Sequence, residues 1–281
     1  MRELDIVRRI RKLAESGGRH ASLVRGIGDD CAILRPRANE DLAFTTDFVL
    51  EGRHFTLDRH TAGEIGHMAL ARSLSDLAAM GSEPVFCLVS VAVPAALSGK
   101  WLNGFYKGLL QLAREYNIAL AGGDLSRFDK VIADVMCCGR VPRGKAILRS
   151  AARAGDAIYV TGALGRSKRP VPRVKEGIAL RRAGVKAAID ISDGLVIDLY
   201  RLCVESGVSA ELSEVPVAKG ASLEDALYRG EDYELLFTAP ARSRLGFARI
   251  GTVMAGEPGE IRMQGKLLEV KGWDHFDESA R

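Results

Sequence analysis

Apolar residues in the first half of the chain fall either at helical spacing or in short runs. Helical spacing is seen at Ile6, Ile10, Leu13 and Ala14, which predicts a helix over Ile6–Glu15 that ends at Gly17-Gly18. A capping-box pattern at Thr61 and Glu64 predicts another helix, with Gly81 at its C-terminal cap, and a further helix is predicted over 101–116. Short apolar runs predict strands at 31–34, 42–46, 85–93, 118–121 and 131–141.

The second half follows a similar pattern after a small, polar stretch over 149–156. Strands are predicted at 157–161, 187–191, 208–212, 233–238 and 249–253, with a hairpin about Gly265. A helix is predicted to follow Asp193-Gly194 and to end at Gly207. Because strands and helices mix without strict βαβ alternation, the pattern predicts an α+β fold, with domains over 1–150 and 151–281.

Composition narrows the class of protein. The 281 residues are 47% hydrophobic and 27% charged, as in ordinary globular proteins. The net charge of +4 is a weak basic excess that by itself does not indicate nucleic-acid binding. No apolar run approaches the ~18–20 residues that cross a bilayer, and the N-terminus lacks the layout of a secretory signal. Five cysteines without a C-x-x-C pattern fit reduced thiols. We therefore expect a cytoplasmic protein that binds neither membrane nor nucleic acid.

Two segments are similar to known binding motifs but do not predict those binding sites. The segment 139–146 is close to a P-loop, but Ala146 replaces the hydroxyl residue that would bind magnesium, and no good helix follows. Glu64 and His67 have the spacing of half a di-iron site, but the capping box already accounts for Glu64.

Aspartates beside glycines or hydroxyl residues recur at the predicted ends of apolar strands. They lie in the segments Gly28-Asp29-Asp30, Thr45-Thr46-Asp47, Ser75-Asp76, Gly122-Gly123-Asp124 and Asp190-Ile191-Ser192-Asp193-Gly194. Each one alone is commonly a turn or a helix cap. Their repetition in a basic protein favours a site for Mg²⁺, which prefers carboxylate oxygens and shares them with substrate phosphates.

Two acidic positions leave alternatives open. Helical geometry makes Asp76 partly buried, where it either pairs with Arg72 or binds a metal. Strand alternation would place Glu231 on the face of Tyr233, Leu235 and Phe237, with Asp232 and Glu234 on the other face. A carboxylate at that position suits a cationic ligand, although a solvated strand end is the commoner explanation.

Together these segments resemble the thiamine-monophosphate kinase family, in the superfamily of aminoimidazole ribonucleotide synthetase and selenophosphate synthetase. The matching stretches, in family order, are Gly26–Leu34, Thr45–Phe55, Ala71–Pro84, Gly122–Asp124, Asp156–Gly162, Ala188–Leu195, Gly230–Phe237 and Trp273–Phe276. The resemblance implies transfer of phosphate from ATP to thiamine monophosphate. It also implies an N-terminal metal- and ATP-binding domain that pairs strands across a homodimer, and a C-terminal domain that closes the nucleotide and substrate cleft.

The resemblance also implies roles for individual residues. The magnesium ligands would be Asp30, Thr45, Thr46, Asp47, Asp76, Asp124, Asp190 and Asp193. The ATP contacts would be Tyr106, Gly123, Asp124, Arg149 and Ser192. The thiamine-phosphate contacts would be His54, Glu231 and Trp273.

The implied chemistry needs no general base, since a phosphate monoester, with a second pKa near ~6, is already largely dianionic. The sequence departs from the family after Gly165, where a shortened segment leads into a basic run over 166–175 that we expect to be solvated. The alternatives are another ATP-dependent enzyme of the superfamily and a non-catalytic nucleotide-binding protein. No cysteine precedes residue 26, which disfavours selenophosphate synthetase.

Overall fold

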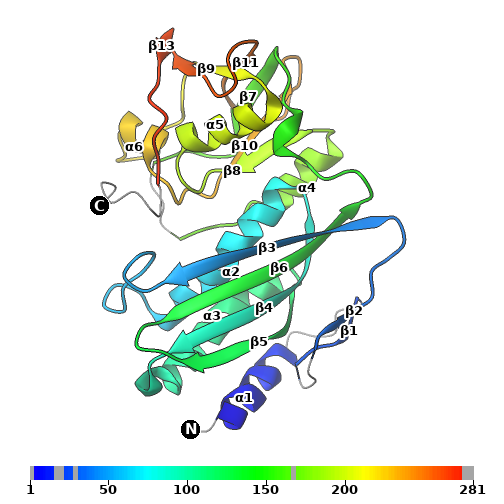
Figure 1. Cartoon of the computed structure of the whole chain (residues 1–281), viewed down its shortest axis with the longest axis vertical. Coiled ribbons are helices and arrows are strands. Elements are labelled where there is room, and N and C mark those ends of the chain that lie inside the picture. The colour runs from blue at the N-terminus through cyan, green and yellow to red at the C-terminus, as the bar shows by residue number, and fades with distance from the viewer. Residues whose placement is uncertain (1–2, 16–21, 28–30, 166–168, 274–281) are drawn as a thin grey trace. The chain divides into compact units, whose positions relative to one another are not determined.

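A computed structural model describes residues 3–15, 22–27, 31–165 and 169–273 (Figure 1). The chain forms two compact units. The first comprises Met1–Leu77 and Glu83–Gly144, and the second comprises Ala78–Ser82 and Lys145–Arg281. Each unit combines a β-sheet with helices, which confirms the predicted α+β class.

The first unit is built on a four-stranded sheet. Its strand order is β3 (Glu40–Leu50), β6 (Ile132–Pro142), β4 (Glu83–Val93) and β5 (Ala119–Arg127). The first two neighbouring pairs are antiparallel, whereas β4 and β5 are parallel. Two long helices, α2 (Ala62–Ala79) and α3 (Lys100–Glu115), lie along one face of this sheet (Figure 1). We refer to the opposite face as the open face.

Smaller elements complete the first unit. They are α1 (Glu3–Glu15), β1 (Leu23–Arg25), β2 (Ile33–Leu34) and the short 3-10 helix η1 (Ala95–Leu97). The antiparallel pair β1–β2 contributes Leu23 and Leu34 to an apolar cluster with Phe86 and Met136 of the sheet. The β1–β2 pair therefore covers part of the open face.

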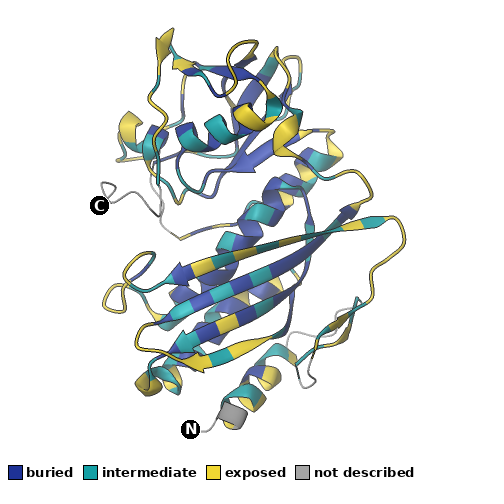
Figure 2. Cartoon of the chain, viewed as in Figure 1, coloured by how far each residue is buried: buried dark blue, intermediate teal, exposed yellow. Residues whose placement is uncertain are grey.

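Alternating burial along the strands separates the two faces (Figure 2). On β3, Val49 is buried, whereas Phe44 and Phe48 are 61% and 58% exposed and lie on the open face. The predicted capping box holds α2 at its start, because the Thr61 backbone N–H donates to Glu64 at 2.8 Å and the Glu64 N–H to the Thr61 hydroxyl at 3.3 Å.

The second unit contains a seven-stranded sheet. In spatial order its strands are β13 (Lys266–Leu267), β12 (Ile261–Met263), β9 (Ser209–Leu212), β11 (Ala248–Met254), β7 (Asp156–Val160), β10 (Leu235–Pro240) and β8 (Ala187–Asp190). Its helices are η2 (Arg149–Ala151), α4 (Val174–Arg182), α5 (Leu195–Ser206) and α6 (Leu223–Tyr228). Buried residues of α5, β7, β8 and β10 form its apolar core, and Figure 2 colours each residue by its burial.

Most predicted elements are present, with corrected ends. The aspartates at 47 and 124 lie inside β3 and β5 rather than at strand ends, because pairing with β6 and β4 extends both strands. Helix α6 was not predicted, although Ser222 and Asp225 form a capping box at its start. The strand predicted from Tyr233 begins only at Leu235.

The basic run after Gly165 differs from expectation at Arg173. Its guanidinium Nε donates to Glu234 at 2.9 Å, and its Nη1 lies 3.4 Å from Glu176, so this arginine is held by the protein rather than solvated. Lys175 is exposed as expected, and residues 166–168 lie outside the described residues. In the parts of the chain that the structure describes, no helix has the length and apolar character needed to span a membrane.

Candidate active site

Helix α2 and strand β3 bring three of the predicted metal-site residues together on the helix-covered face of the first sheet. The buried Ser73 hydroxyl donates to the Val135 carbonyl of β6 at 2.7 Å, which anchors α2 to the sheet. One turn further along, Asp76 accepts a hydrogen bond from the hydroxyl of Thr45. Asp47 lies two residues along β3 from Thr45, on the same face of the sheet.

Arg72 contributes a positive charge to this group. Its guanidinium lies 3.8 Å from the Asp47 carboxylate, and its side chain is only 12% exposed. The pKa of the Cys137 thiol is raised by burial, and the charges of Asp47 and Asp76 add to this rise, so both carboxylates lie near that thiol. The structure thus gives Asp76 a threonine partner and Asp47 an arginine partner.

Two further acidic residues of the first unit, Asp124 and Asp134, lie on the open face. Asp134 of β6 pairs with Ser90 of β4, and Ser90 pairs with Asp124 of β5, so these three residues form one row across the sheet. Thr46 also faces this side, where its hydroxyl donates to Asp134 at 2.5 Å. Nothing in the sequence pattern singled out Asp134, because no glycine or hydroxyl residue lies beside it.

A cavity of about 940 Å³ lies beside this row, between the N-terminal elements and the sheet. Three of the five predicted ATP contacts line it, namely Tyr106, Gly123 and Asp124. Gly123 has a φ of +148°, and a Cβ there would lie 1.9 Å from the Val89 carbonyl oxygen, so only glycine fits. Tyr106 is buried, which raises the pKa of its phenol, and the charges of Cys87 and Asp124 add to this rise.

His54 is held in the turn that follows β3. Its Nδ1 accepts the Leu50 backbone N–H at 3.0 Å, which directs the ring proton of a neutral imidazole to Nε2. Asp30 lies outside the described residues. Among the described residues, no group of three or more His, Cys, Asp or Glu side chains is arranged to hold a metal ion.

In the second unit, predicted site residues gather at the connection between β8 and α5. Asp190 ends β8 and is buried, and Ser192 and Asp193 follow it. Asp198, in the first turn of α5, is fully buried and accepts the backbone N–H groups of Ser192 and Asp193, both at 3.0 Å. Burial raises the pKa of Asp198 to about 7, and the charge of Asp190 adds to the rise.

The segment 230–234 departs from the strand that the sequence predicted. Glu231 and Tyr233 have φ values of +69° and +52°, which a strand does not allow, so Glu231 does not share a strand face with Tyr233. Their backbone N–H groups donate instead to the carbonyls of Ser192 at 2.7 Å and Ile191 at 2.8 Å. The predicted strand is therefore wrong at residues 231–234, and the binding role of Glu231 stays a prediction.

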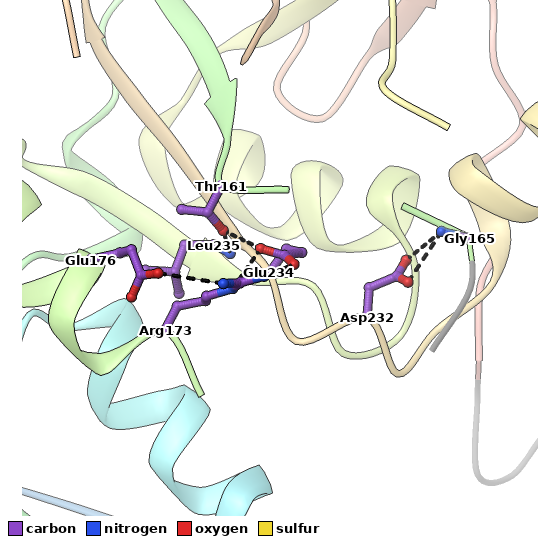
Figure 3. A network of polar contacts seen from close by, with 7 residues as sticks. All are labelled: Thr161, Gly165, Arg173, Glu176, Asp232, Glu234 and Leu235. Atoms are coloured by element: carbon purple, nitrogen blue, oxygen red, sulfur yellow. Dashed lines mark hydrogen bonds and ion pairs between the residues drawn. The ribbon is translucent and has the colours of Figure 1, made fainter. Parts of the chain in front are cut away.

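The neighbouring carboxylates Asp232 and Glu234 hold the short segment that follows β7 (Figure 3). Asp232 accepts the Gly165 N–H through both oxygens, at 2.9 and 3.1 Å. Glu234 is buried and accepts the Thr161 hydroxyl at 2.5 Å together with the guanidinium of Arg173. The alternation of apolar and polar residues in the sequence did not predict that Asp232 and Glu234 hold this segment.

The last two predicted residues of the second unit are Arg149 and Trp273. Arg149 begins η2 and is exposed. Trp273 is partly exposed, and its backbone N–H donates to the Asp193 carbonyl at 2.8 Å. Asp274–Phe276, the rest of that matching stretch, lie outside the described residues.

The fold and these sites define a class of protein. Residues 28–141 match the family described as AIR synthase related protein, N-terminal domain. The chain is 34% identical to the thiamine-monophosphate kinase of Buchnera aphidicola subsp. Acyrthosiphon pisum over 304 aligned positions. This alignment covers 90% of this chain and 93% of that protein. The chain belongs to the thiamine-monophosphate kinase family, which confirms the resemblance noted in the sequence.

Solved structures agree with this assignment. The thiamine-monophosphate kinase of Stenotrophomonas maltophilia K279a superposes with a TM-score of 0.83 at 34% identity, over 95% of this chain and 98% of that chain. The structure of AaThiL complexed with AMPPCP and TMP superposes with a TM-score of 0.78 at 30% identity, over 98% and 99% of the two chains. The alignment with the Buchnera protein spans 304 positions, which is more than the 281 residues of this chain. The Buchnera protein therefore carries segments that this chain lacks.

Proposed function

We propose that this chain transfers the γ-phosphate of ATP directly to thiamine monophosphate, giving thiamine diphosphate, with Mg²⁺ at the acidic residues. The observation that carries the proposal is the cavity of the first unit, where Tyr106, Gly123 and Asp124 lie together. A cavity of that size is in the range that accommodates a nucleotide-sized ligand. Membership of the kinase family and a relative solved with AMPPCP and TMP support the same assignment.

The donor atoms fit magnesium by their chemistry. Thr45, Asp47 and Asp76 offer hydroxyl and carboxylate oxygens beside β3, and Asp124 offers another carboxylate on β5. Hard oxygen ligands of this kind are those that Mg²⁺ takes when it shares coordination with phosphates. We propose Asp30, Thr46, Asp190 and Asp193 as further magnesium ligands. Bound Mg²⁺ would neutralise charge on the phosphates during transfer.

The residues of the chain perform the remaining tasks by binding and orientation. The acceptor phosphate is largely dianionic near neutral pH, so no side chain has to remove a proton from it. His54, Arg149 and Ser192 offer donors to phosphate oxygens, and Glu231 and Trp273 suit the cationic thiazolium ring. Positioned in this way, the acceptor phosphate would approach the γ-phosphate of ATP in line with the bond that breaks.

We also propose that the protein is a cytoplasmic homodimer that pairs through the first sheet. Strand β3 lies at the edge of that sheet and carries the exposed Phe44 and Phe48 on its open face. Exposed aromatic side chains on an edge strand favour association with a second copy. Sedimentation of the purified chain tests this, with a dimer as the expected species.

A product assay tests the proposed reaction. Purified protein, ATP and Mg²⁺ are incubated with thiamine monophosphate or with thiamine, and the products are separated by chromatography. We expect thiamine diphosphate from the monophosphate, no product from thiamine, and no turnover with EDTA. Phosphorylation of thiamine alone would overturn the proposal, and ATP binding without turnover of either acceptor would favour a non-catalytic nucleotide-binding protein.

A further inference from the structure

The loop between β8 and α5 is held from inside the second unit by a single carboxylate. The backbone N–H groups of Ser192, Asp193 and Gly194 donate to the same Oδ2 atom of Asp198, at 3.0, 3.0 and 3.2 Å. Asp198 is fully buried. Successive N–H groups that converge on one point form the kind of concavity that binds anions, and here a side chain of the protein fills it.

The carbonyl groups of the same loop hold two other segments. The Ser192 carbonyl accepts the Glu231 N–H at 2.7 Å, and the Ile191 carbonyl accepts the Tyr233 N–H at 2.8 Å. The Asp193 carbonyl accepts the Trp273 N–H at 2.8 Å. Glu231 and Trp273, two of the three residues assigned to thiamine phosphate, therefore take their backbone positions from the loop that carries Ser192 and Asp193.

Arg201 extends the arrangement to the side chain of Asp193. Its Nη1 lies 2.6 Å from Asp193 Oδ2 and 2.6 Å from Asp198 Oδ1. Since Arg201 lies on α5, within one turn of Asp198, the helix fixes both groups at once. The direction of the Asp193 carboxylate is thus set by the same buried residue through one intervening guanidinium.

We propose that Asp198 is a positioning residue that couples the nucleotide side of the active site to the acceptor side. It holds the loop by its N–H groups, and the loop in turn presents Ser192 and Asp193 to ATP and metal and fixes Glu231 and Trp273 by its carbonyls. This inference rests on the proposed function for the identity of the two substrates. It assigns Asp198 no contact with either of them.

The coupling predicts that both substrates respond to one substitution. In Asp198→Asn the amide group cannot accept hydrogen bonds at the position of one carboxylate oxygen, so some of the hydrogen bonds to the loop or to Arg201 are broken. We expect the KM for ATP and the KM for thiamine monophosphate each to rise roughly tenfold, with a lower kcat. Hydrogen exchange should become faster at the amides of Ser192, Asp193 and Trp273.

Matched variants separate positioning from stability. Asp225→Asn removes a carboxylate of the same type from an exposed helix cap in the same unit, so it should leave both KM values and the loop amides unchanged. Arg201→Gln serves if Asp198→Asn does not fold, because the Arg201 side chain is 38% exposed. We expect it to raise both KM values less and to loosen the same amides.

The outcomes distinguish this inference from the proposed function. A folded Asp198→Asn protein with a lower melting temperature and unchanged KM values, or with only one KM changed, would overturn the coupling. Unchanged exchange at the loop amides would overturn it as well. If the unmodified protein makes no thiamine diphosphate, the proposed function fails, whereas faster exchange in Asp198→Asn at 192–194 and at Trp273 together still supports Asp198 as the residue that positions them.

Discussion

The two units hold their candidate site residues in different ways. In the first unit, Thr45 and Asp47 belong to a strand that is paired along its whole length, and Asp76 belongs to a long buried helix. In the second unit, Ser192, Glu231 and Trp273 lie in connecting segments that hold one another by backbone hydrogen bonds. A substitution in the first unit should therefore act locally, whereas breaking one hydrogen bond in the second unit should displace several residues.

The largest expected effect tests the local behaviour of the first unit. Asp47→Asn and Asp124→Asn should each lower kcat by at least ~10²-fold, about 3 kcal/mol, because each would remove charge that stabilises phosphoryl transfer. The fold should be kept, since strand pairing does not involve these side chains. The measurement is steady-state kinetics at saturating Mg²⁺, with circular dichroism for the fold.

Asp41→Asn is the matched control for these variants. Asp41 is an exposed carboxylate on the same strand as Asp47, where it accepts the Gly144 N–H at 2.7 Å. Its replacement should leave kcat near normal. A folded Asp47→Asn or Asp124→Asn protein with normal activity would show that the aspartate in question is structural.

The next effect concerns the polar contacts that hold the second unit. Arg173→Ala leaves the buried carboxylate of Glu234 without its cation, and breaking such a pair costs about 3–5 kcal/mol in a fully buried setting. Because the Arg173 side chain is 29% exposed, we expect the free energy of unfolding to fall by about 2 kcal/mol. Denaturant unfolding measures this change.

Lys175→Ala provides the comparison, because Lys175 is exposed and lies two residues away. It should change the free energy of unfolding by less than about 0.5 kcal/mol. Equal losses in both variants would mean that the contacts in Figure 3 do not stabilise the unit.

A smaller effect is expected at the acceptor pocket. Glu231→Gln and Trp273→Ala should weaken binding of thiamine monophosphate and leave ATP binding nearly unchanged. A carboxylate or indole beside a cationic ring contributes about 0.5–2 kcal/mol, so the dissociation constant should rise several-fold to roughly thirtyfold. Each ligand is titrated separately in Mg²⁺. An equal loss of ATP affinity would place these two side chains in the structure rather than in the pocket.

The smallest expected effect concerns the rate at which a thiol in the cavity of the first unit is alkylated. Cys31 is exposed and lines that cavity, whereas the other four cysteines are buried. Burial also raises the pKa of Cys87 and of Cys203 to about 12, which keeps these two thiols protonated and slow to alkylate. Alkylation near neutral pH should therefore modify Cys31 first, and Mg²⁺ with ATP should slow it several-fold. Mass spectrometry follows the reaction, and an unchanged rate would argue against nucleotide in this cavity.

Sequence patterns predicted the parts of the molecule that depend on local order. The capping box at Thr61 and Glu64 and the helix end before Gly207 were predicted because these signals involve residues close together in the chain. The extension of β5 through Gly123 and Asp124 was missed, since it depends on pairing with β4, a strand that is distant in the sequence.

The candidate site shows the same limit. Family motifs singled out Ser192, Asp193 and Glu231. Asp198, which holds the loop of Ser192 and Asp193, lies four positions beyond Gly194, and its sequence context is that of an ordinary aspartate in a helix. The geometry of Glu231 could not be predicted either, because positive φ values at non-glycine residues arise from tertiary contacts.

The filled concavity before α5 also bears on the kinetics of nucleotide association. Many loops that bind phosphate through backbone N–H groups become ordered only when the anion arrives, and this ordering reduces the affinity and slows the encounter. Here the N–H groups of Ser192, Asp193 and Gly194 already have Asp198 as their acceptor. The entropy of ordering this loop is lost when the chain folds, so the association of ATP should proceed in a single fast phase, without a slow step contributed by this segment.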